Sequence, residues 1–109
     1  MRRGDTIVVS LVGNFGKPRP AVIVQSNSLI GLDTLLVVPF TTTLSESVSL
    51  RPKIEPDATN GLEAVSQAMI DKLTAFRLKR VGAAIGRLSE ADIARIDQRI
   101  AFALGFRDL

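Results

Sequence analysis

The sequence contains no cysteine and no histidine. Without cysteine, disulfide bonds and thiolate metal sites are excluded. Without histidine, the chain lacks the side chain used most often for general acid–base catalysis and for binding transition metals. Asp5, Asp33 and Asp71 stand apart in the sequence, without the clustered carboxylates that a metal-dependent nuclease needs. We therefore expect neither a metal nor another cofactor, and any catalysis must use carboxylates, hydroxyls, lysine, arginine or backbone amides.

Tryptophan and tyrosine are absent too, so stacking on a nucleic-acid base would fall to the five phenylalanines or to arginine side chains. The longest apolar runs, such as residues 35–38, are far too short to span a bilayer. Charges at Arg2, Arg3 and Asp5 precede only a short apolar stretch, which does not fit a secretory signal. We expect no association with a membrane and a cytoplasmic location.

What the chain does contain is enough apolar material for a core. Its 109 residues, 46% of them hydrophobic, fit a single domain over residues 1–109 and argue against intrinsic disorder. The net charge is +3, and basic residues gather at 17–19, 51–53 and 77–80. This modest excess is compatible with a polyanionic partner and equally with an ordinary solvated surface.

Strands dominate the predicted secondary structure. Stretches rich in β-branched residues, bounded by turn residues, predict strands over 5–12, 20–26 and 34–40. The third is almost entirely apolar, as expected for a strand covered on both faces. Alternating side chains predict a half-exposed strand over 47–54, and strands over 62–73 and 81–85 complete the set. The fold class is therefore mainly β, with about six mostly antiparallel strands.

One helix is predicted at the end of the chain. Ser89 is followed three residues later by Asp92, the spacing at which a hydroxyl and a carboxylate satisfy free N–H groups at a helix start. Apolar residues then recur every three to four positions, and Gly105 is a plausible stop. The apolar stripe, expected to pack on the sheet, consists of Ile93, Ile96, Ile100 and Leu104.

Three segments in this order resemble the MazF/PemK family of toxin–antitoxin ribonucleases. The first comprises Arg3-Gly4-Asp5 and the Arg-Pro step within residues 16–24, and the second is the strand end Val-Val-Pro-Phe-Thr-Thr over 37–42. The third runs from Ser66 through 69–72 to 80–82 and closes with Gly-Arg-Leu-Ser over 86–89. Each is weak alone, but their joint order spans nearly the whole chain. The resemblance implies a small SH3-like β-barrel of the CcdB/PemK type with a C-terminal helix.

The resemblance assigns catalysis to Arg19 and Thr41. A guanidinium offers charge and a two-pronged fork to a phosphate, and the prolines on both sides of Arg19 restrict its backbone. Thr41, at the end of an apolar strand, can offer its hydroxyl to a phosphate oxygen. Arginine is a poor proton donor because its pKa exceeds about 12, so phosphate binding is the primary role expected of Arg19.

Further residues are candidates for binding the substrate, each with a simpler alternative. Asp71 and Lys72 match family positions that contact RNA bases, but they fit an exposed ion pair equally well. Lys17 is a phosphate contact or a solubilising charge, and Phe15 either stacks on a base or packs beneath its loop. The complete set is Asn14, Phe15, Lys17, Thr42, Asp71 and Lys72.

One feature departs from the family. The loop before the Arg-Pro step often carries an acidic or hydroxyl residue that helps to deprotonate the 2′-hydroxyl, whereas residues 12–17 here read Val-Gly-Asn-Phe-Gly-Lys. The sequence therefore does not identify the general base.

The resemblance implies a toxin that cuts single-stranded messenger RNA without a metal ion, leaving 2′,3′-cyclic phosphate and 5′-hydroxyl ends. It also implies a homodimer whose RNA groove is filled by a cognate antitoxin. Two other functions stay open: a gyrase poison of the CcdB type, although the chain ends Phe-Arg-Asp-Leu without tryptophan, and a non-catalytic barrel that binds nucleic acid or peptide.

Overall fold

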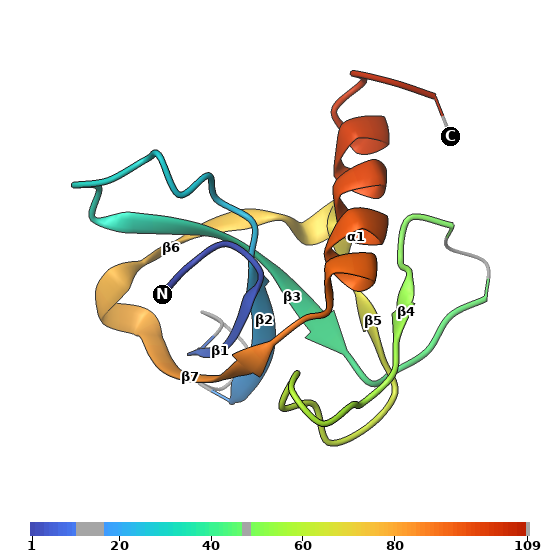
Figure 1. The fold of residues 1–109 in the computed structure, drawn as a ribbon, viewed down its shortest axis with the longest axis horizontal. Helices are drawn as coiled ribbons and strands as arrows, with labels where there is room; N and C mark the ends of the chain where they lie inside the picture. Colours follow the sequence, from blue (N-terminus) through green and yellow to red (C-terminus); the bar gives the residue numbers. More distant parts are fainter. Residues whose placement is uncertain (11–16, 47–48, 109) are drawn as a thin grey trace.

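The computed structural model describes residues 1–10, 17–46 and 49–108 (Figure 1). One long helix stands beside a curled sheet, and two short 3-10 helices, η1 and η2, interrupt the second half of the chain. The strands are β1 (Asp5–Ser10), β2 (Pro18–Ile23), β3 (Thr34–Thr41), β4 (Lys53–Ile54), β5 (Ser66–Ala68), β6 (Thr74–Arg77) and β7 (Val81–Arg87). The helices are η1 (Ile70–Lys72), η2 (Leu78–Arg80) and α1 (Glu90–Ala103).

The strands form one seven-stranded sheet in the order β4-β5-β3-β2-β1-β7, and β6 also pairs with β3. Every recorded strand pair is antiparallel. The sheet curls into an open half-barrel with α1 against one side (Figure 1). The expected fold class, a small antiparallel barrel with a C-terminal helix, is confirmed. None of the helices within the described ranges is long and apolar enough to cross a membrane.

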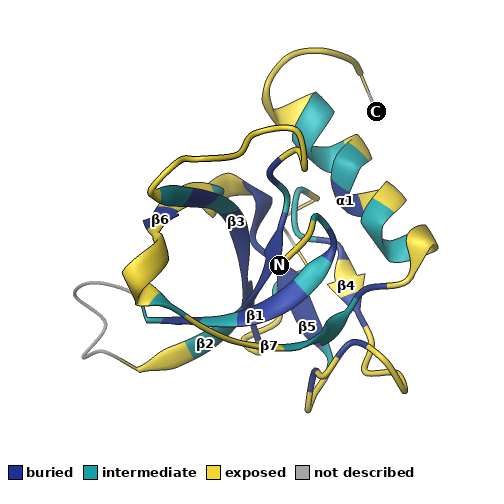
Figure 2. Ribbon diagram, turned by 60° about the vertical axis from the view of Figure 1, so that its left-hand side comes forward, coloured by how far each residue is buried: buried dark blue, intermediate teal, exposed yellow. Residues whose placement is uncertain are grey.

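Strand β3 runs through the middle of the core. The buried side chains of the described residues form two clusters, and β3 contributes to both. Leu35 and Val37 belong to the first cluster, together with Ile7 and Phe76. Val38 and Phe40 lie in the second cluster, which includes Ile54 and Ile96. Successive side chains of a strand point to opposite faces, so β3 contributes side chains to both cores. Figure 2 shows most of this strand as buried. This confirms the prediction that the third strand is covered on both faces.

Helix α1 begins with the predicted Ser89 cap, whereas the Asp92 carboxylate has a side-chain partner in place of the predicted backbone N–H. The Ser89 hydroxyl accepts a hydrogen bond from the backbone N–H of Asp92 at 3.1 Å, while the Asp92 carboxylate accepts from Arg95. Ile96 is buried, and Ile93 and Ile100 pack against the cluster that contains Phe40. The buried part of the stripe ends there, because Leu104 is the C-cap residue of the helix and is 60% exposed. Its predicted place in the core is wrong.

Two predicted strands are shorter in the structure. Among the described residues of the predicted strand 47–54, Lys53–Ile54 form a strand and the residues before them turn. Pro52, which has no N–H to donate, accepts a hydrogen bond from Ala68 N at 3.0 Å. Leu50 still packs against the core, which explains the alternating pattern. Residues 62–73 are interrupted by η1, since the N–H groups of Lys72 and Leu73 bond back to Met69 and Ile70.

The remaining strands differ in their ends or were missed. Strand β2 stops at Ile23 because the N–H groups of Val24 and Gln25 both reach the Leu36 oxygen. Strand β6 was not predicted, and Phe76 is its one buried residue, so the sequence offers no periodicity there. The described part of the first strand ends at Ser10.

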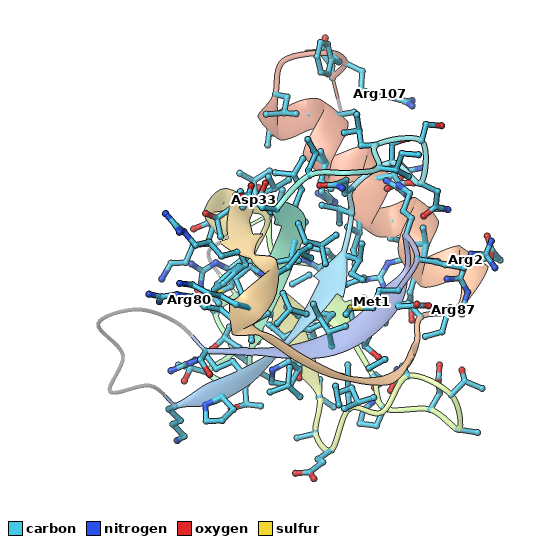
Figure 3. All side chains as sticks on the ribbon, turned by 90° about the vertical axis from the view of Figure 1, so that its left-hand side faces the viewer. Met1, Arg2, Asp33, Arg80, Arg87 and Arg107 are labelled. Atoms are coloured by element: carbon cyan, nitrogen blue, oxygen red, sulfur yellow. The ribbon has the colours of Figure 1, made fainter. Side chains whose placement is uncertain are left out.

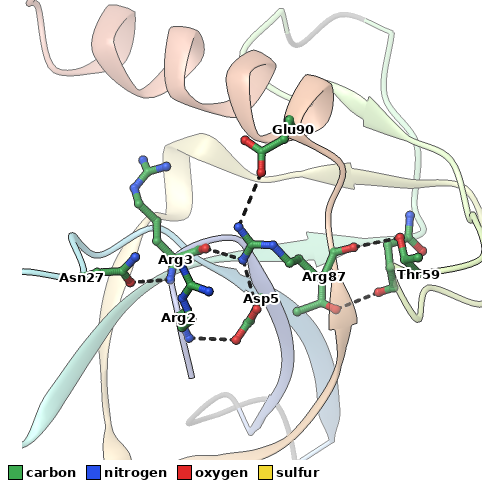
Figure 4. A network of polar contacts seen from close by, with 9 residues as sticks. Arg2, Arg3, Asp5, Asn27, Thr59, Arg87 and Glu90 are labelled. Atoms are coloured by element: carbon green, nitrogen blue, oxygen red, sulfur yellow. Dashed lines mark hydrogen bonds and ion pairs between the residues drawn. The ribbon is translucent and has the colours of Figure 1, made fainter.

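Two segments that carry the family resemblance contact each other at the start of the sheet (Figure 4). The Arg87 guanidinium donates to the Arg3 carbonyl at 2.7 Å and to Asp5 Oδ1 at 3.2 Å. The Leu88 N–H donates to the Gly4 carbonyl at 3.0 Å. The matched residues 3–5 and 86–89 therefore join the first strand to the entrance of α1, which is a structural role.

Candidate active site

The site arises where two neighbouring strands separate. Strands β2 and β3 pair through Ile23, Val22 and Ala21, and the pairing ends at Ala21 opposite Pro39. Continued by two residues, the same register would set Arg19 opposite Thr41. The β2–β3 pairing does not extend that far, and on their other edges Arg19 pairs with Val9 of β1 and Thr41 with Gln67 of β5. Pro20 and Pro39 lack the N–H groups that a ladder requires, which favours the separation.

A hollow of about 260 Å³ fills this fork. Arg19 is half-buried in its wall between the two prolines, with Lys17 exposed at the rim. Thr41 lines the opposite side and is only 8% exposed, whereas Thr42 is open to solvent. The full lining consists of Lys17, Pro18, Arg19, Pro20, Phe40, Thr41, Thr42, Thr43 and Ser66. Four of the predicted site residues, Lys17, Arg19, Thr41 and Thr42, therefore meet in one place.

A buried glutamine braces the threonine side of the hollow. The Gln67 side chain accepts from Ser45 N at 2.6 Å and donates to the carbonyls of Ser45 and Arg51 at 2.8 and 3.0 Å. Thr41 Oγ1 accepts from Thr43 N at 3.1 Å, which turns the chain immediately after β3. Gln67 thus holds the segment after Thr41 against β5. Sequence reasoning missed it because a lone glutamine in a short strand gives no pattern.

Asp71 and Lys72 lie elsewhere, in η1, and do not line this hollow. Both carboxylate oxygens of Asp71 accept from Arg51, through Nε and Nη2, each at 2.9 Å. This side-chain hydrogen bonding lowers the pKa of Asp71 and raises the pKa of Arg51. The sequence alone gave no reason to pair Arg51 with Asp71, which are 20 positions apart.

The basic residues of the 77–80 cluster are not among the described residues that line the hollow. Lys79 and Arg80 are exposed in η2, where Arg80 points away from the sheet (Figure 3). Asn14 and Phe15 lie outside the described residues. Within the described ranges, no three acidic side chains gather as a metal site.

A second hollow of about 420 Å³ adjoins the first. The two share residues 18–20, Thr42 and Ser66, so Arg19 stands on the boundary between them. Ser66 is buried, and its hydroxyl donates to the Ala64 carbonyl at 2.9 Å. It matched the family at the sequence level but was not assigned to the site.

Comparison with known proteins gives a consistent result. The family model of PemK-like, MazF-like toxins of type II toxin–antitoxin systems matches residues 2–104. A protein of Mycolicibacterium smegmatis named probable endoribonuclease MazF is 40% identical over 106 residues, covering 96% of this chain and 97% of the relative.

Solved structures share the fold. The Mycobacterium tuberculosis toxin MazF-mt6 aligns with a TM-score of 0.80 and 22% identity, over 95% of this chain and 99% of its own. A mycobacterial endoribonuclease solved in complex with its cognate antitoxin aligns with a TM-score of 0.83 and 20% identity, over 100% and 99% of the two chains. The chain therefore belongs to the family of PemK-like, MazF-like toxins of type II toxin–antitoxin systems.

Proposed function

We propose that this toxin is an endoribonuclease that cuts single-stranded messenger RNA at specific sequences, in the hollow between Arg19 and Thr41. The observation that carries the proposal is the fork itself, which brings a half-buried guanidinium and a strand-end hydroxyl together at one hollow. The naming of the Mycolicibacterium smegmatis relative as a probable endoribonuclease supports the same activity. Single strands are the expected substrate because splayed bases expose the edges that can be read.

The proposed reaction needs no external nucleophile. The 2′-oxygen of one ribose attacks the adjacent phosphorus and loses its proton, an O–P bond forms, and the bond from phosphorus to the 5′-oxygen breaks. The departing oxygen takes up a proton. The products are a 2′,3′-cyclic phosphate and a 5′-hydroxyl, so the protein has to orient the attack, stabilise the added charge on the phosphoryl oxygens and deliver protons.

Arg19 is assigned to the phosphoryl charge, because a guanidinium stays protonated and presents parallel N–H donors. The Thr41 oxygen accepts from Thr43 N, which leaves its own hydroxyl proton for a phosphoryl oxygen. Lys17 and Thr42, exposed at the rim, are assigned to flanking phosphates. Asn14, Phe15, Asp71 and Lys72 are assigned to bases further along the RNA.

No carboxylate lines the first hollow among the described residues, so we assign the general base to none of these side chains. A hydroxyl, a backbone group or water would take the proton of the 2′-hydroxyl.

The proposal includes two protein partners. A cognate antitoxin would silence the toxin by filling the groove, as the family's type II toxin–antitoxin description and the antitoxin complex of the mycobacterial structure suggest. A second copy of the chain would form a homodimer with the groove across the interface. The family match over residues 2–104 supports a single toxin domain. We also propose that the toxin acts in the cytoplasm, where its messenger RNA substrate is found.

The test is incubation of the purified protein with a long single-stranded RNA in excess EDTA, followed by analysis of the 3′ ends. We expect discrete fragments ending in cyclic phosphates, lost in Arg19→Ala and retained in Arg95→Ala, a matched change in an exposed helix ion pair. Intact RNA after incubation with a folded wild-type protein would contradict the proposal. The two alternative functions, a gyrase poison and a non-catalytic barrel that binds nucleic acid or peptide, would then be the ones to test. Supercoiling of DNA by gyrase would then be assayed.

A further inference from the structure

The second hollow is a continuation of the first. Its remaining lining comes from three separate parts of the chain: Val8 of β1, Ile85 of β7 and residues 61–64 before β5. Because Arg19 stands on the shared boundary, a phosphate held there would have its neighbouring nucleoside over this second hollow. The hollow is thus placed to receive a group covalently attached to the scissile phosphate.

The lining of this hollow suits a flat, mostly apolar ring with one polar edge. Its apolar members are Val8, Pro18, Pro20, Leu62, Ala64 and Ile85. Glu63 contributes the only carboxylate among the described residues that line either hollow. Ligand sites in proteins commonly combine apolar walls with a few polar groups that fix orientation. A carboxylate at neutral pH only accepts hydrogen bonds, so it selects a partner that donates.

The wall that carries Glu63 is held rigidly. A methyl group on Gly61 would lie 2.3 Å from the Ile85 carbonyl oxygen, so this segment is seated directly on the backbone of β7. Asn60 is fully buried; its side-chain oxygen accepts from Leu62 N at 3.0 Å and its Nδ2 donates to the Glu55 carbonyl at 2.8 Å. Thr6 Oγ1 donates to the Asn60 carbonyl at 2.7 Å. A preformed wall lowers the entropy lost when a ligand binds.

We infer that the second hollow is a nucleobase subsite, in which Glu63 accepts from the exocyclic amino group of the base beside the scissile phosphate. This inference rests on the proposed ribonuclease function. Cytosine, adenine and guanine carry such an amino group, whereas uracil presents carbonyl oxygens on both sides of its N–H. A carboxylate therefore favours the three amino-bearing bases and discriminates against uracil.

Base preference measured on a randomised single-stranded RNA tests the role of Glu63. With wild-type toxin, we expect uracil to be disfavoured by about tenfold at one position adjacent to the cut, the discrimination typical of a good base contact. Glu63→Gln supplies an amide that also donates to uracil oxygens, so the discrimination at that position falls and uracil-containing RNA is cut at least as fast as before. Glu55→Gln, a nearby exposed glutamate outside this hollow, leaves the preference unchanged.

Filling the hollow tests its occupancy by a base. Ala64 is exposed and lines the hollow, so Ala64→Leu occupies the space without cutting into the core. We expect cleavage of ordinary RNA to fall by about tenfold, whereas RNA with an abasic residue at the adjacent position is cut equally by both proteins. The thermal unfolding midpoint of Ala64→Leu confirms that the variant is folded.

Several results would overturn the subsite. If the base preference of Glu63→Gln equals that of wild type, Glu63 does not recognise the base. If Glu63→Gln cuts every RNA more slowly by the same factor, the carboxylate takes part in the reaction instead. A change of oligomeric state in Ala64→Leu, with base preference intact, shows a second copy covering the hollow. If wild-type toxin cuts no RNA, ribonuclease activity fails, while the inference is still tested by binding of amino-bearing and uracil-bearing oligonucleotides that lack the 2′-hydroxyl at the cut.

Discussion

Arg51 and Asp71 form a bidentate ion pair, in which Nε and Nη2 of Arg51 each donate to a different carboxylate oxygen at 2.9 Å. The pair joins the segment before β4 to η1, and it uses a carboxylate that the family resemblance assigns to RNA. An oligonucleotide that reads Asp71 has to share that carboxylate with Arg51 or displace it. Within the described part of the chain, Asp71 is therefore ion-paired with Arg51, a partner that the sequence did not indicate, and not with its neighbour Lys72.

The pair predicts a defined pH dependence of stability. The pKa of Asp71 is lowered from 3.8 in the folded protein, so the stabilisation is fully present above about pH 4 and is lost as the pH falls through the folded value. The Asp71 side chain is 37% exposed, which limits its contribution to about 1 kcal/mol or less. Urea unfolding of wild type and Asp71→Asn measures this: the stability difference present at pH 7 is expected to shrink steadily as the pH is lowered below 3.8. A difference that does not change as the pH falls below 3.8 contradicts the assignment.

Gln67 is predicted to matter more for stability than its single amide suggests. Replacing it by leucine removes three hydrogen bonds, to the Ser45 N–H and to the carbonyls of Ser45 and Arg51, and each such bond contributes about 0.5–1.5 kcal/mol. Thermal unfolding measures the loss, with the exposed Gln98→Leu as control. Hydrogen exchange is expected to rise at the Ser45 amide first. A Gln67→Leu variant as stable as the control would show that this clamp is dispensable.

Thr41 is predicted to act through its hydroxyl. Thr41→Val removes the donor with little change in volume, and loss of one charge-stabilising donor lowers catalysis by about 100-fold. Thr41→Ser restores most of the rate because the donor returns. Single-turnover cleavage of a short RNA measures both, with the exposed Thr74→Val of β6 as control. Equal rates for Thr41→Val and wild type would remove Thr41 from the mechanism.

Two glycines with positive φ provide a matched test of packing. Gly31 (φ +79°) has no atom within 4 Å of an added methyl group, so Gly31→Ala incurs only the backbone strain of about 1 kcal/mol. Gly61 (φ +72°) has the same strain and also the overlap with Ile85, which adds about 1–3 kcal/mol. Chemical denaturation is expected to rank Gly61→Ala as the less stable variant. Equal destabilisation of the two variants would mean that the backbone at Gly61 and Ile85 moves apart at little cost.

The sequence predicted those parts of the molecule in which apolar side chains repeat over many residues. The continuous apolar run of β3 and the three-to-four spacing in α1 were both recognisable, since each element buries a long face. Strand β6 was missed because burial depends on Phe76 alone. Leu104 fitted the helical spacing, but the spacing contains no information about where the sheet beneath it ends.

The site was predictable only by resemblance. Arg19 and Thr41 are 22 positions apart, and no local pattern relates them; the strand register does. Gln67 and Arg51 escaped notice because their roles depend on backbone groups that only the folded chain brings near. Glu63 lines the same hollow as Arg19 because the segment before β5 packs against β7, which no local pattern predicts.

The separation of β2 and β3 means that the two assigned catalytic residues depend on different supporting strands. Arg19 is held by β1 through its pairing with Val9, whereas Thr41 is held by β5 through Gln67. A lesion in either supporting strand displaces one partner and leaves the other in position. Mutations that allow cells to survive the toxin, selected at random, would therefore cluster along two distant stretches of the gene, one for each arm of the fork.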